Sequence, residues 1–430
     1  MYNMKKGRYD QNKNKKNNRD VISYEDMPLD DYEQEKTDIS PEAVKKIIIS
    51  ICIALVTGLI VFAFANRDKL TPENLSTWWT YEVLGNAGNG YPVNIIGSEV
   101  SLGNIDVNQG RIAYASDTSF VTLNSTGSEV LNTQIKTSNP VLKSNSDRYL
   151  TYSLGGTSYQ IHTFDQDIYS GETEDVIYTG DISSNGTYCL VTEGNGYLST
   201  LYVFNSYNNR IFKYSFLEYY INTVSLNSDG TGCIASGITS DAGAVSSGVY
   251  VLDFKKEEPA SFYKINGDSI IEAEYINSNN GILIGQTASY IFKNGDENYI
   301  TNSYEDKKLV NYCFNYDTAT YTVALSRSGD GKSCVLVQYK YNGDALYSIE
   351  TEYSADSISV YKGRVLILDG NTAYVYNTDG KMIFSADAGT GAKKIIMTSD
   401  STAYVLCSNQ IRFIDFNANL NENQDKTENS

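Results

Sequence analysis

The chain has very few of the residues that enzymes use most often for catalysis, since only one of its 430 residues is a histidine. That residue, His162, alternates with Ile161 and Thr163 in a strand-like run, so no serine- or cysteine-based triad can be argued from it. No H-E-x-x-H, P-loop or G-x-S-x-G motif occurs. We therefore predict no catalytic residue, no metal site and no bound cofactor, and we interpret His162 as structural or surface-lying.

Cysteine is also scarce, and its spacing excludes two common uses. Cys52 lies in an apolar run, and the remaining five are odd in number and show no C-x-x-C spacing. This pattern argues against a disulfide framework and against structural zinc. Each of the five falls in a strand-like run, so we expect small buried side chains; one disulfide between neighbouring strands is the alternative. The five are Cys189, Cys233, Cys313, Cys334 and Cys407.

Basic residues are outnumbered, with 34 Lys and Arg against 52 Asp and Glu and a net charge of −18. Residues 1–65 carry equal numbers of the two signs, so the whole net charge belongs to the part that follows. Such a surface repels nucleic acid and other anionic polymers, and we predict no nucleic-acid partner. Acidity is also ordinary for a soluble exported domain.

The longest uncharged run extends from Ile47 to Ala65, between Lys45-Lys46 and Arg67-Asp68-Lys69. It is long enough to cross a bilayer as a helix, and Ser40-Pro41-Glu42 has the composition of a helix start. We predict a single transmembrane helix over residues 41–67, with residues 47–65 in the lipid bilayer. The alternatives are a buried core helix and a signal peptide cleaved after Ala63-Phe64-Ala65.

The distribution of basic residues sets the expected orientation. Residues 1–46 carry ten Lys or Arg, whereas residues 66–110 carry only two, Arg67 and Lys69. This asymmetry places the N-terminus in the cytoplasm. We predict a disordered cytoplasmic tail over residues 1–40, and a cell-membrane protein whose C-terminal domain is extracytoplasmic.

A linker is predicted over residues 68–90. Thr71-Pro72-Glu73-Asn74 is a helix-start pattern, and the membrane-proximal aromatics Trp78, Trp79 and Tyr81 follow it. These rings either anchor in the membrane interface or belong to a short helix that packs on the folded domain. The glycine-rich segment 85–90 is expected to be a flexible joint.

From residue 91 to residue 416 the pattern is that of many short antiparallel strands. One strand type recurs, starting at residues 111, 149, 187, 232, 281, 321, 364 and 402, and a partner strand follows each copy. Eight units of about 40 residues with four short strands each predict an all-β, eight-bladed β-propeller. A seven-bladed propeller is the alternative, if the weak unit around residues 160–185 merges with its neighbour.

The eighth unit has no fourth strand of its own. After Phe416 the chain is polar to Ser430, so we predict a disordered tail over residues 417–430. The segment Tyr91-Pro-Val-Asn-Ile-Ile-Gly-Ser precedes the first unit and is predicted to supply the missing outermost strand, since an unpaired edge is a liability. The chain would then enter on the face that carries the first-to-second and third-to-fourth turns, which we expect nearer the membrane.

The opposite face should carry the binding loops. Its longest predicted loop is Gly237 to Gly248, and long loops on rigid scaffolds often bind partners. Asn227-Ser-Asp-Gly and Asn377-Thr-Asp-Gly look superficially like calcium loops but lack the ligand count, so we interpret them as hairpin turns. The interaction candidates in the loop are Thr239, Ser240, Asp241, Ser246 and Ser247.

Two resemblances carry further expectations. The repeat Ala373-Tyr-Val-Tyr-Asn-Thr-Asp-Gly-Lys-Met-Ile-Phe resembles quinoprotein-like propeller repeats, although the quinone-dependent dehydrogenases dock their blades through a repeated tryptophan that residues 91–416 lack. The whole chain resembles an uncharacterised family of single-pass bacterial membrane proteins with an extracytoplasmic propeller. The residues that carry this are Leu70-Thr-Pro-Glu-Asn-Leu with Trp78, Gly90-Tyr-Pro-Val-Asn-Ile-Ile-Gly and Ser116-Asp-Thr-Ser-Phe-Val-Thr-Leu-Asn. That resemblance implies no activity.

We predict a protein-interaction scaffold or sensor of the cell envelope whose partner is another envelope protein. A cell-wall glycan-binding module is the alternative, because 36 tyrosines, including Tyr219-Tyr220, could supply stacking platforms with polar edges. A quinoprotein-type enzyme is the third hypothesis. It requires a cofactor that the purified protein would reveal by its absorbance.

Overall fold

The computed structural model describes residues 45–46, 49–50, 55–58, 90–108, 110–135, 137–241, 243–277, 280–293, 295–327 and 332–417. The first three of these segments are helical. Within the described ranges, none of the helices has both the length and the apolar character needed to span a bilayer. Most of the predicted membrane span 47–65, the linker with Trp78, Trp79 and Tyr81, and the tails 1–40 and 418–430 lie outside the described residues.

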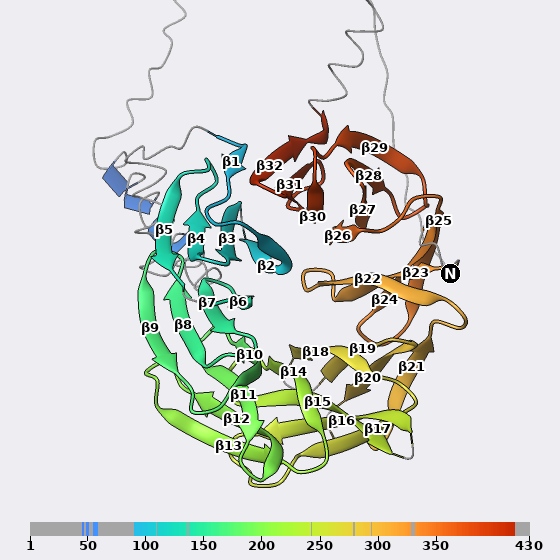
Figure 1. Ribbon diagram of the computed structural model, residues 1–430. Helices are drawn as coiled ribbons and strands as arrows, with labels where there is room; N and C mark the ends of the chain where they lie inside the picture. The colour runs from blue at the N-terminus through green and yellow to red at the C-terminus, as the bar shows by residue number, and fades with distance from the viewer. Residues whose placement is uncertain are drawn as a thin grey trace, which may run out of the picture. The chain divides into compact units, whose positions relative to one another are not determined.

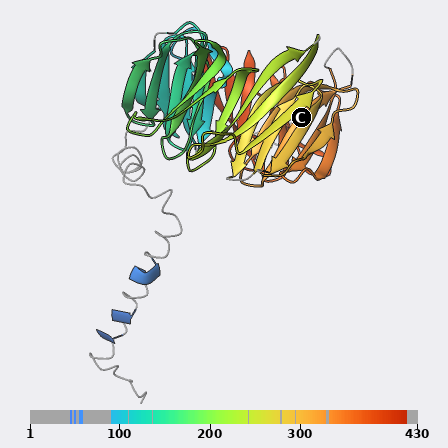
Figure 2. The ribbon, with the colours of Figure 1, turned by 90° about the horizontal axis from the view of Figure 1, so that it is seen from below.

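The remainder of the described chain is an eight-bladed β-propeller (Figure 1). Each blade is one four-stranded antiparallel sheet whose strands follow one another from the centre to the periphery, with one exception at the closure. The side view shows the strands of each blade running between the two faces of the ring (Figure 2). The predicted eight blades are therefore confirmed, and the seven-bladed alternative is wrong.

The strands fall into four concentric sets, each named in blade order. The innermost strands are β2 (Val100–Asn108), β6 (Pro140–Asn145), β10 (Ile177–Ile182), β14 (Tyr220–Leu226), β18 (Ile270–Asn277), β22 (Lys308–Asn315), β26 (Ser357–Tyr361) and β30 (Ala392–Met397). The second strands are β3 (Arg111–Ser116), β7 (Arg148–Ser153), β11 (Tyr188–Gly194), β15 (Gly232–Asp241), β19 (Asn280–Gly285), β23 (Thr320–Ser326), β27 (Arg364–Asp369) and β31 (Thr402–Cys407).

The two peripheral sets complete the blades. The third strands are β4 (Ser119–Leu123), β8 (Ser158–Thr163), β12 (Tyr197–Phe204), β16 (Ala244–Asp253), β20 (Ala288–Lys293), β24 (Cys334–Lys340), β28 (Thr372–Tyr376) and β32 (Gln410–Asp415). The outermost strands are β5 (Glu129–Gln134), β9 (Asp167–Glu172), β13 (Arg210–Phe216), β17 (Ser261–Asn266), β21 (Tyr299–Ser303), β25 (Ala345–Thr351), β29 (Met382–Asp387) and β1 (Val93–Asn94).

The ring is closed by the N-terminal strand, as predicted. β1 pairs antiparallel with β32, with Val93 opposite Ile411 and Asn94 opposite Gln410. The Ile95 amide extends this pairing by donating to the Asn409 carbonyl at 3.0 Å. The first described residues of the propeller and its last strand are thus held in one sheet, which removes an open edge.

The unit around residues 160–185, which was weak in sequence, contributes complete strands to blades two and three. Its strand β9 shows almost no burial, because it is the solvent-facing periphery of blade two. An outermost strand buries little on either face, so it lacks the alternation of apolar and polar residues by which strands are recognised.

The core consists of apolar layers between neighbouring blades. One layer joins blades three and four and contains Val191, Leu201 and Val224 together with Cys189 and Cys233. All five cysteines of the described propeller are free thiols, four of them buried and Cys313 partly exposed. Burial raises the pKa of Cys334 to about 11, so these side chains serve as small apolar core residues and the inter-strand disulfide is absent.

The two faces of the ring differ in their connections. We name the face with the first-to-second and third-to-fourth turns the turn face, and the opposite one the loop face. On the turn face the Asn377 side chain accepts hydrogen bonds from the Asp379 and Lys381 amides at 3.1 and 2.9 Å, and Gly380 has a φ of 75°. These are tight hairpin turns, as predicted, and not calcium loops.

The segment predicted as the longest loop is instead a hairpin. β15 continues to Asp241 and β16 begins at Ala244, with Gly237 paired to Gly248 and Thr239 to Ser246. The prediction of a loop from Gly237 to Gly248 was wrong because glycine, serine and alanine give no apolar alternation even where they form strand ladders. The small residues have a packing role here, because Tyr219, Tyr220 and Ile221 approach the two glycines closely.

Candidate functional site

The inner strands carry a repeated irregularity where they begin, at the loop face. In five of the eight blades the pairing of the first and second strands shifts by one residue near that end. A β-bulge of this kind leaves one residue outside the ladder and re-aims its side chain. The residues skipped by the ladder are Tyr178, Asn222, Ile271, Val310 and Lys393.

The Asn222 bulge ties two blades together, because its side-chain amide donates to the Ile270 carbonyl at 2.8 Å. Ile271 and Val310 instead remain exposed. In a regular ladder, successive side chains of an inner strand would point alternately toward the two neighbouring blades. The bulges interrupt this alternation, so apolar side chains gather around the loop-face end of the inner strands.

A groove of about 720 Å³ opens among these side chains. Its walls come from blades two to five, and Tyr178 and Val141 contribute half-buried lining. Exposed apolar side chains are ordinary when scattered, whereas a cluster around one cavity makes that cavity a candidate interaction site. Four lining residues are both apolar and exposed: Leu154 (45%), Tyr220 (53%), Ile238 (36%) and Ile271 (37%).

The groove adjoins a second cavity, of about 600 Å³, that is lined mainly by the inner strands of blades one to six. Lys143 and Glu272 line both cavities, and the Lys143 Nζ lies 3.9 Å from Glu272 Oε1. We call the second cavity the channel. Its described ionisable lining comprises Asp106, Lys143, Asp181, Glu272, Glu274, Tyr275, Tyr312 and Tyr316.

Tyrosine hydroxyls orient the channel carboxylates. Tyr312 Oη donates to Glu272 Oε2 at 3.2 Å, and Tyr316 Oη donates to Glu274 Oε1 at 2.7 Å. The Leu226 amide of blade four donates to Asp181 Oδ2 of blade three at 2.7 Å. Each of these carboxylates is therefore held in place by the fold.

The channel shifts the proton affinity of these groups. Burial, reinforced by Asp181, raises the pKa of Glu274 to about 8, and burial raises the pKa of Asp181 to about 6 against the opposing effect of Lys143. Burial acts to lower the pKa of Lys143, but attraction by Glu272 and the neighbouring acids outweighs it and raises that pKa. Shifted carboxylates in a cavity are a hallmark of functional sites.

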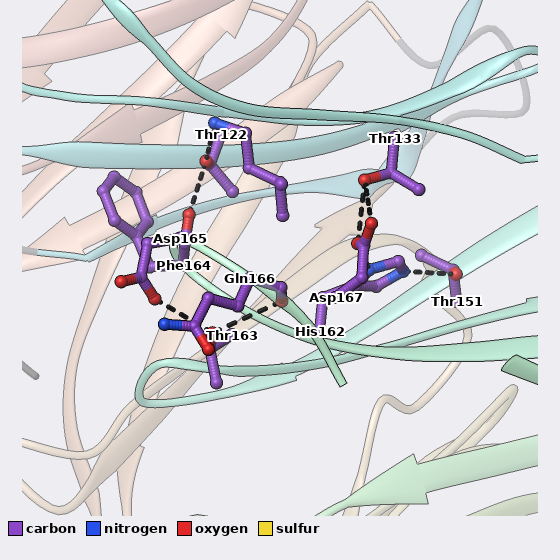
Figure 3. Close-up of polar contacts among 10 residues, drawn as sticks. Thr122, Thr133, Thr151, His162, Thr163, Phe164, Asp165, Gln166 and Asp167 are labelled. Atoms are coloured by element: carbon purple, nitrogen blue, oxygen red, sulfur yellow. Dashed lines mark hydrogen bonds and ion pairs between the residues drawn. The ribbon is translucent and has the colours of Figure 1, made fainter. Parts of the chain in front are cut away.

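A second polar cluster surrounds the only histidine (Figure 3). Thr151 Oγ1 lies 3.1 Å from His162 Nε2, and His162 Nδ1 lies 2.7 Å from Asp167 Oδ1. The order of hydroxyl, imidazole and carboxylate is that of a hydrolytic triad. However, His162 is 1% exposed, and its ring stacks on Phe120 at a centroid distance of 4.2 Å.

This His162 cluster links blades one and two. Asp167 also accepts from the Thr133 hydroxyl of blade one at 2.7 Å. Burial lowers the pKa of His162 although Asp167 opposes this, so the imidazole is neutral, with Nδ1 donating to Asp167 and Nε2 accepting from Thr151. Both ring nitrogens are used and both Thr151 and His162 are buried, so we assign the cluster to the packing of the two blades.

The propeller matches a family of unknown function, DUF5711, over residues 93–416. The chain belongs to this family. No curated protein matches it. Among solved structures it is similar to BamB from Moraxella catarrhalis, with 10% identity, a TM-score of 0.49 and coverage of 76% of this chain and 100% of that one. It is also similar to apo AztD from Citrobacter koseri, with 11% identity, a TM-score of 0.49 and coverage of 68% and 88%.

For this family member, the predicted interaction residues lie beside the groove and not in it. Thr239 is half-buried and Ser240 exposed, directly after the groove residue Ile238 in β15. Ser246 and Ser247 are buried. The Ser247 hydroxyl donates to the Asp268 carbonyl and accepts from the Ile270 amide, both at 3.0 Å, so its hydroxyl connects blade four to blade five.

Other predicted features are placed as follows. Asp241 ends β15 opposite Ala244, and Trp78, Trp79 and Tyr81 lie outside the described residues. Tyr219 is buried, whereas Tyr220 lines the groove. Within the described ranges, no group of three or more His, Cys, Asp or Glu side chains could hold a metal ion.

The groove and the channel were not found from the sequence. A signal for the channel was present, because Ile270-Ile-Glu-Ala-Glu-Tyr places two carboxylates on one side of an otherwise apolar strand. Charged residues that alternate with apolar ones inside a first strand would have indicated a polar centre. The groove had no such signal, since its walls come from four separate blades.

Proposed function

We propose that this protein is a membrane-anchored scaffold or sensor of the cell envelope, which binds another envelope protein through the loop-face groove. The observation that carries the proposal is the convergence of Leu154, Tyr220, Ile238 and Ile271 on one cavity. A protein partner would remove these apolar side chains from water, which stabilises a complex in proportion to the area buried.

The direction of the chain agrees with this role. β1 runs toward the loop face, because Asn94 pairs with Gln410 at the start of β32. At the other end of the strand, the Gly90 amide donates to the Thr126 carbonyl in a turn of the turn face at 3.0 Å. The described propeller therefore begins at the turn face, on the opposite side of the ring from the groove.

The test is a crosslinking pull-down of the full-length protein from intact cells, identified by mass spectrometry. Ile271→Ser removes an exposed groove side chain, and Ile211→Ser is the matched control on the outermost strand β13, where Ile211 is also exposed. We expect the wild type and Ile211→Ser to enrich the same one or two envelope proteins and Ile271→Ser to lose them. Equal enrichment by all three would rule out the groove as the binding surface.

Glycan binding is the second candidate, and a separate cavity favours it. A space of about 400 Å³ on the loop face of blades one and two is lined by hydroxyl and amide groups together with Ile135, Gly171 and the carboxylate of Glu172. Two atoms of its lining, Thr137 Oγ1 and Gln160 Oε1, are buried without a hydrogen-bond partner. Buried polar atoms are normally satisfied, and a neutral polyhydroxyl ligand such as a saccharide would satisfy both.

Retention of the full-length protein on insoluble cell-wall material tests this candidate. Thr137→Val and Gln160→Leu should abolish retention, whereas Ile271→Ser should leave it unchanged. Absence of retention in the wild type would leave the scaffold proposal as the sole one.

A further inference from the structure

Two charged residues, Lys143 and Glu272, form the floor of the groove, and their charges restrict which ligands can bind there. Lys143 and Glu272 stand where the groove meets the channel. Beyond them the channel contains Asp106, Asp181 and Glu274, so its described lining carries four carboxyl groups and one lysine. An occupant of the groove that extended into the channel would meet an excess of acidic groups.

We propose that the partner segment bound in the groove presents a Lys or Arg side chain, which passes between the apolar walls and ends at the carboxylates of Glu272 and Glu274. This inference rests on the proposed function, because it assumes a polypeptide in the groove. Long basic side chains suit the arrangement, since their stems pack on apolar surface while their charged ends reach polar surroundings.

The carboxylates have capacity for such a guest. Tyr316 donates to one oxygen of Glu274, while a carboxylate accepts about four hydrogen bonds through its two oxygens. Lys143 lies 3.9 Å from Glu272, which is too long for a charge-assisted hydrogen bond of about 2.7–2.9 Å. An incoming ammonium or guanidinium could therefore bind without displacing an ideal internal ion pair.

Charge also discriminates between classes of partner. An acidic segment would face repulsion from the channel and from the net charge of −18, and like charges brought together oppose association. A purely apolar segment would bury the channel carboxyl groups without compensation, which is unfavourable. A segment with one basic residue among apolar neighbours fits both features, because its apolar side chains match the groove walls and its cation matches the channel carboxylates.

Binding should depend on pH, because the guest interacts with the ionised carboxylates. The ionisable groups that interact electrostatically with Glu272, Glu274 or Asp181 are Lys143, Tyr152, Tyr312, Tyr316 and Tyr341, and Lys394 interacts with the further channel residue Asp106. A cation stabilises ionised Glu274 and Asp181, so its binding releases protons and its affinity rises from about pH 5.5 to about pH 8.5.

The experiment uses the full-length chain and fluorescent peptides with capped ends. One probe is Ac-Leu-Val-Lys-Val-Leu-amide, and two others carry norleucine or glutamate in place of lysine. We expect the lysine peptide to bind the wild type about tenfold more tightly than the norleucine peptide, in keeping with a hydrogen bond to a charged group. The glutamate peptide should bind most weakly.

Three variants identify the floor. Glu274→Gln and Glu272→Gln should each weaken the lysine peptide and leave the norleucine peptide unchanged, while Lys143→Met, which removes a competing cation, should tighten the lysine peptide. Glu257→Gln at an exposed position is the matched control. Glu274 is not the ion-pair partner of Lys143, so Glu274→Gln still tests the inference if Glu272→Gln folds poorly.

The outcomes separate this inference from the proposed function. If Ile271→Ser weakens the binding of all three peptides but Glu272→Gln and Glu274→Gln change nothing, the groove binds polypeptide, and the inference of a basic side chain at the two glutamates is wrong. If Ile271→Ser also changes nothing, the groove itself is excluded. Tighter binding of the glutamate or norleucine peptide than of the lysine peptide would overturn the inference directly.

Discussion

Gly248 lies so close to Tyr219 that a Cβ atom on it would stand 2.7 Å from the tyrosine ring. Gly248 pairs with Gly237 in the β15–β16 hairpin, and a Cβ on Gly237 would stand 2.7 Å from the Tyr220 carbonyl oxygen. The two glycines thus allow the start of β14 to press against the hairpin. That contact leaves Tyr219 buried and Tyr220 exposed at the groove.

Gly248→Ala should destabilise the propeller by about 1–3 kcal/mol, because the tyrosine ring has to move to admit the new methyl group. The measurement is the free energy of unfolding from urea denaturation. Gly103→Ala is the control, since nothing lies within 4 Å of its added Cβ. Equal stability of the two variants would contradict the packing role of Gly248.

His162 should make the propeller less stable as the pH falls. Its folded-state pKa is lowered by burial, so the unfolded chain takes up the proton first when the pH drops through about 6.5. His162→Gln removes this effect and should show a weaker loss of melting temperature between about pH 7.5 and about pH 5. Asp181 and Glu274 titrate in both proteins, so the comparison isolates the histidine; parallel pH profiles would contradict it.

The closing strand should contribute measurably to stability. Val93 packs with the buried cluster that includes Tyr404 and Ile411, so Val93→Asp would bring a charge into an apolar contact and cost at least about 1 kcal/mol. Val245→Asp, at an exposed position of β16, is the control and should be near neutral. Hydrogen exchange should show faster exchange of the Ile95 amide in Val93→Asp alone, and unchanged exchange would contradict the closure.

The thiols of the folded propeller should react slowly. Burial raises the pKa of Cys313 to about 12 and that of Cys334 to about 11, and the thiolate is the reactive form. Near neutral pH a maleimide should label none of the five propeller cysteines within minutes, and all five after unfolding in guanidinium. Peptide mapping by mass spectrometry gives the positions, and rapid native labelling of Cys189 or Cys233 would contradict their burial.

Local signals explain why the fold could be predicted. Second and third strands are buried on both sides and are rich in Val, Ile and Tyr, so they recur visibly, as in Arg364–Asp369 and Thr372–Tyr376. The turn that follows the third strand of this blade carries its own chemistry in Asn377 and Gly380. The end of the β15–β16 hairpin was not predicted, because this part of its ladder consists mostly of Gly, Ser, Thr and Ala. These residues can form a strand but give no strand signal in the sequence.

The sequence by itself determined the propeller and its closure by the N-terminal strand and favoured eight blades over seven, because these follow from repeated strand patterns and from the one missing strand. Only the tertiary structure decided that Leu154, Tyr220, Ile238 and Ile271 line one groove and that Lys143 meets Glu272 at its floor. The physical reason is distance along the chain. These residues lie in three blades and come together only when the ring closes, whereas a sequence pattern reports only on neighbours within one strand or turn.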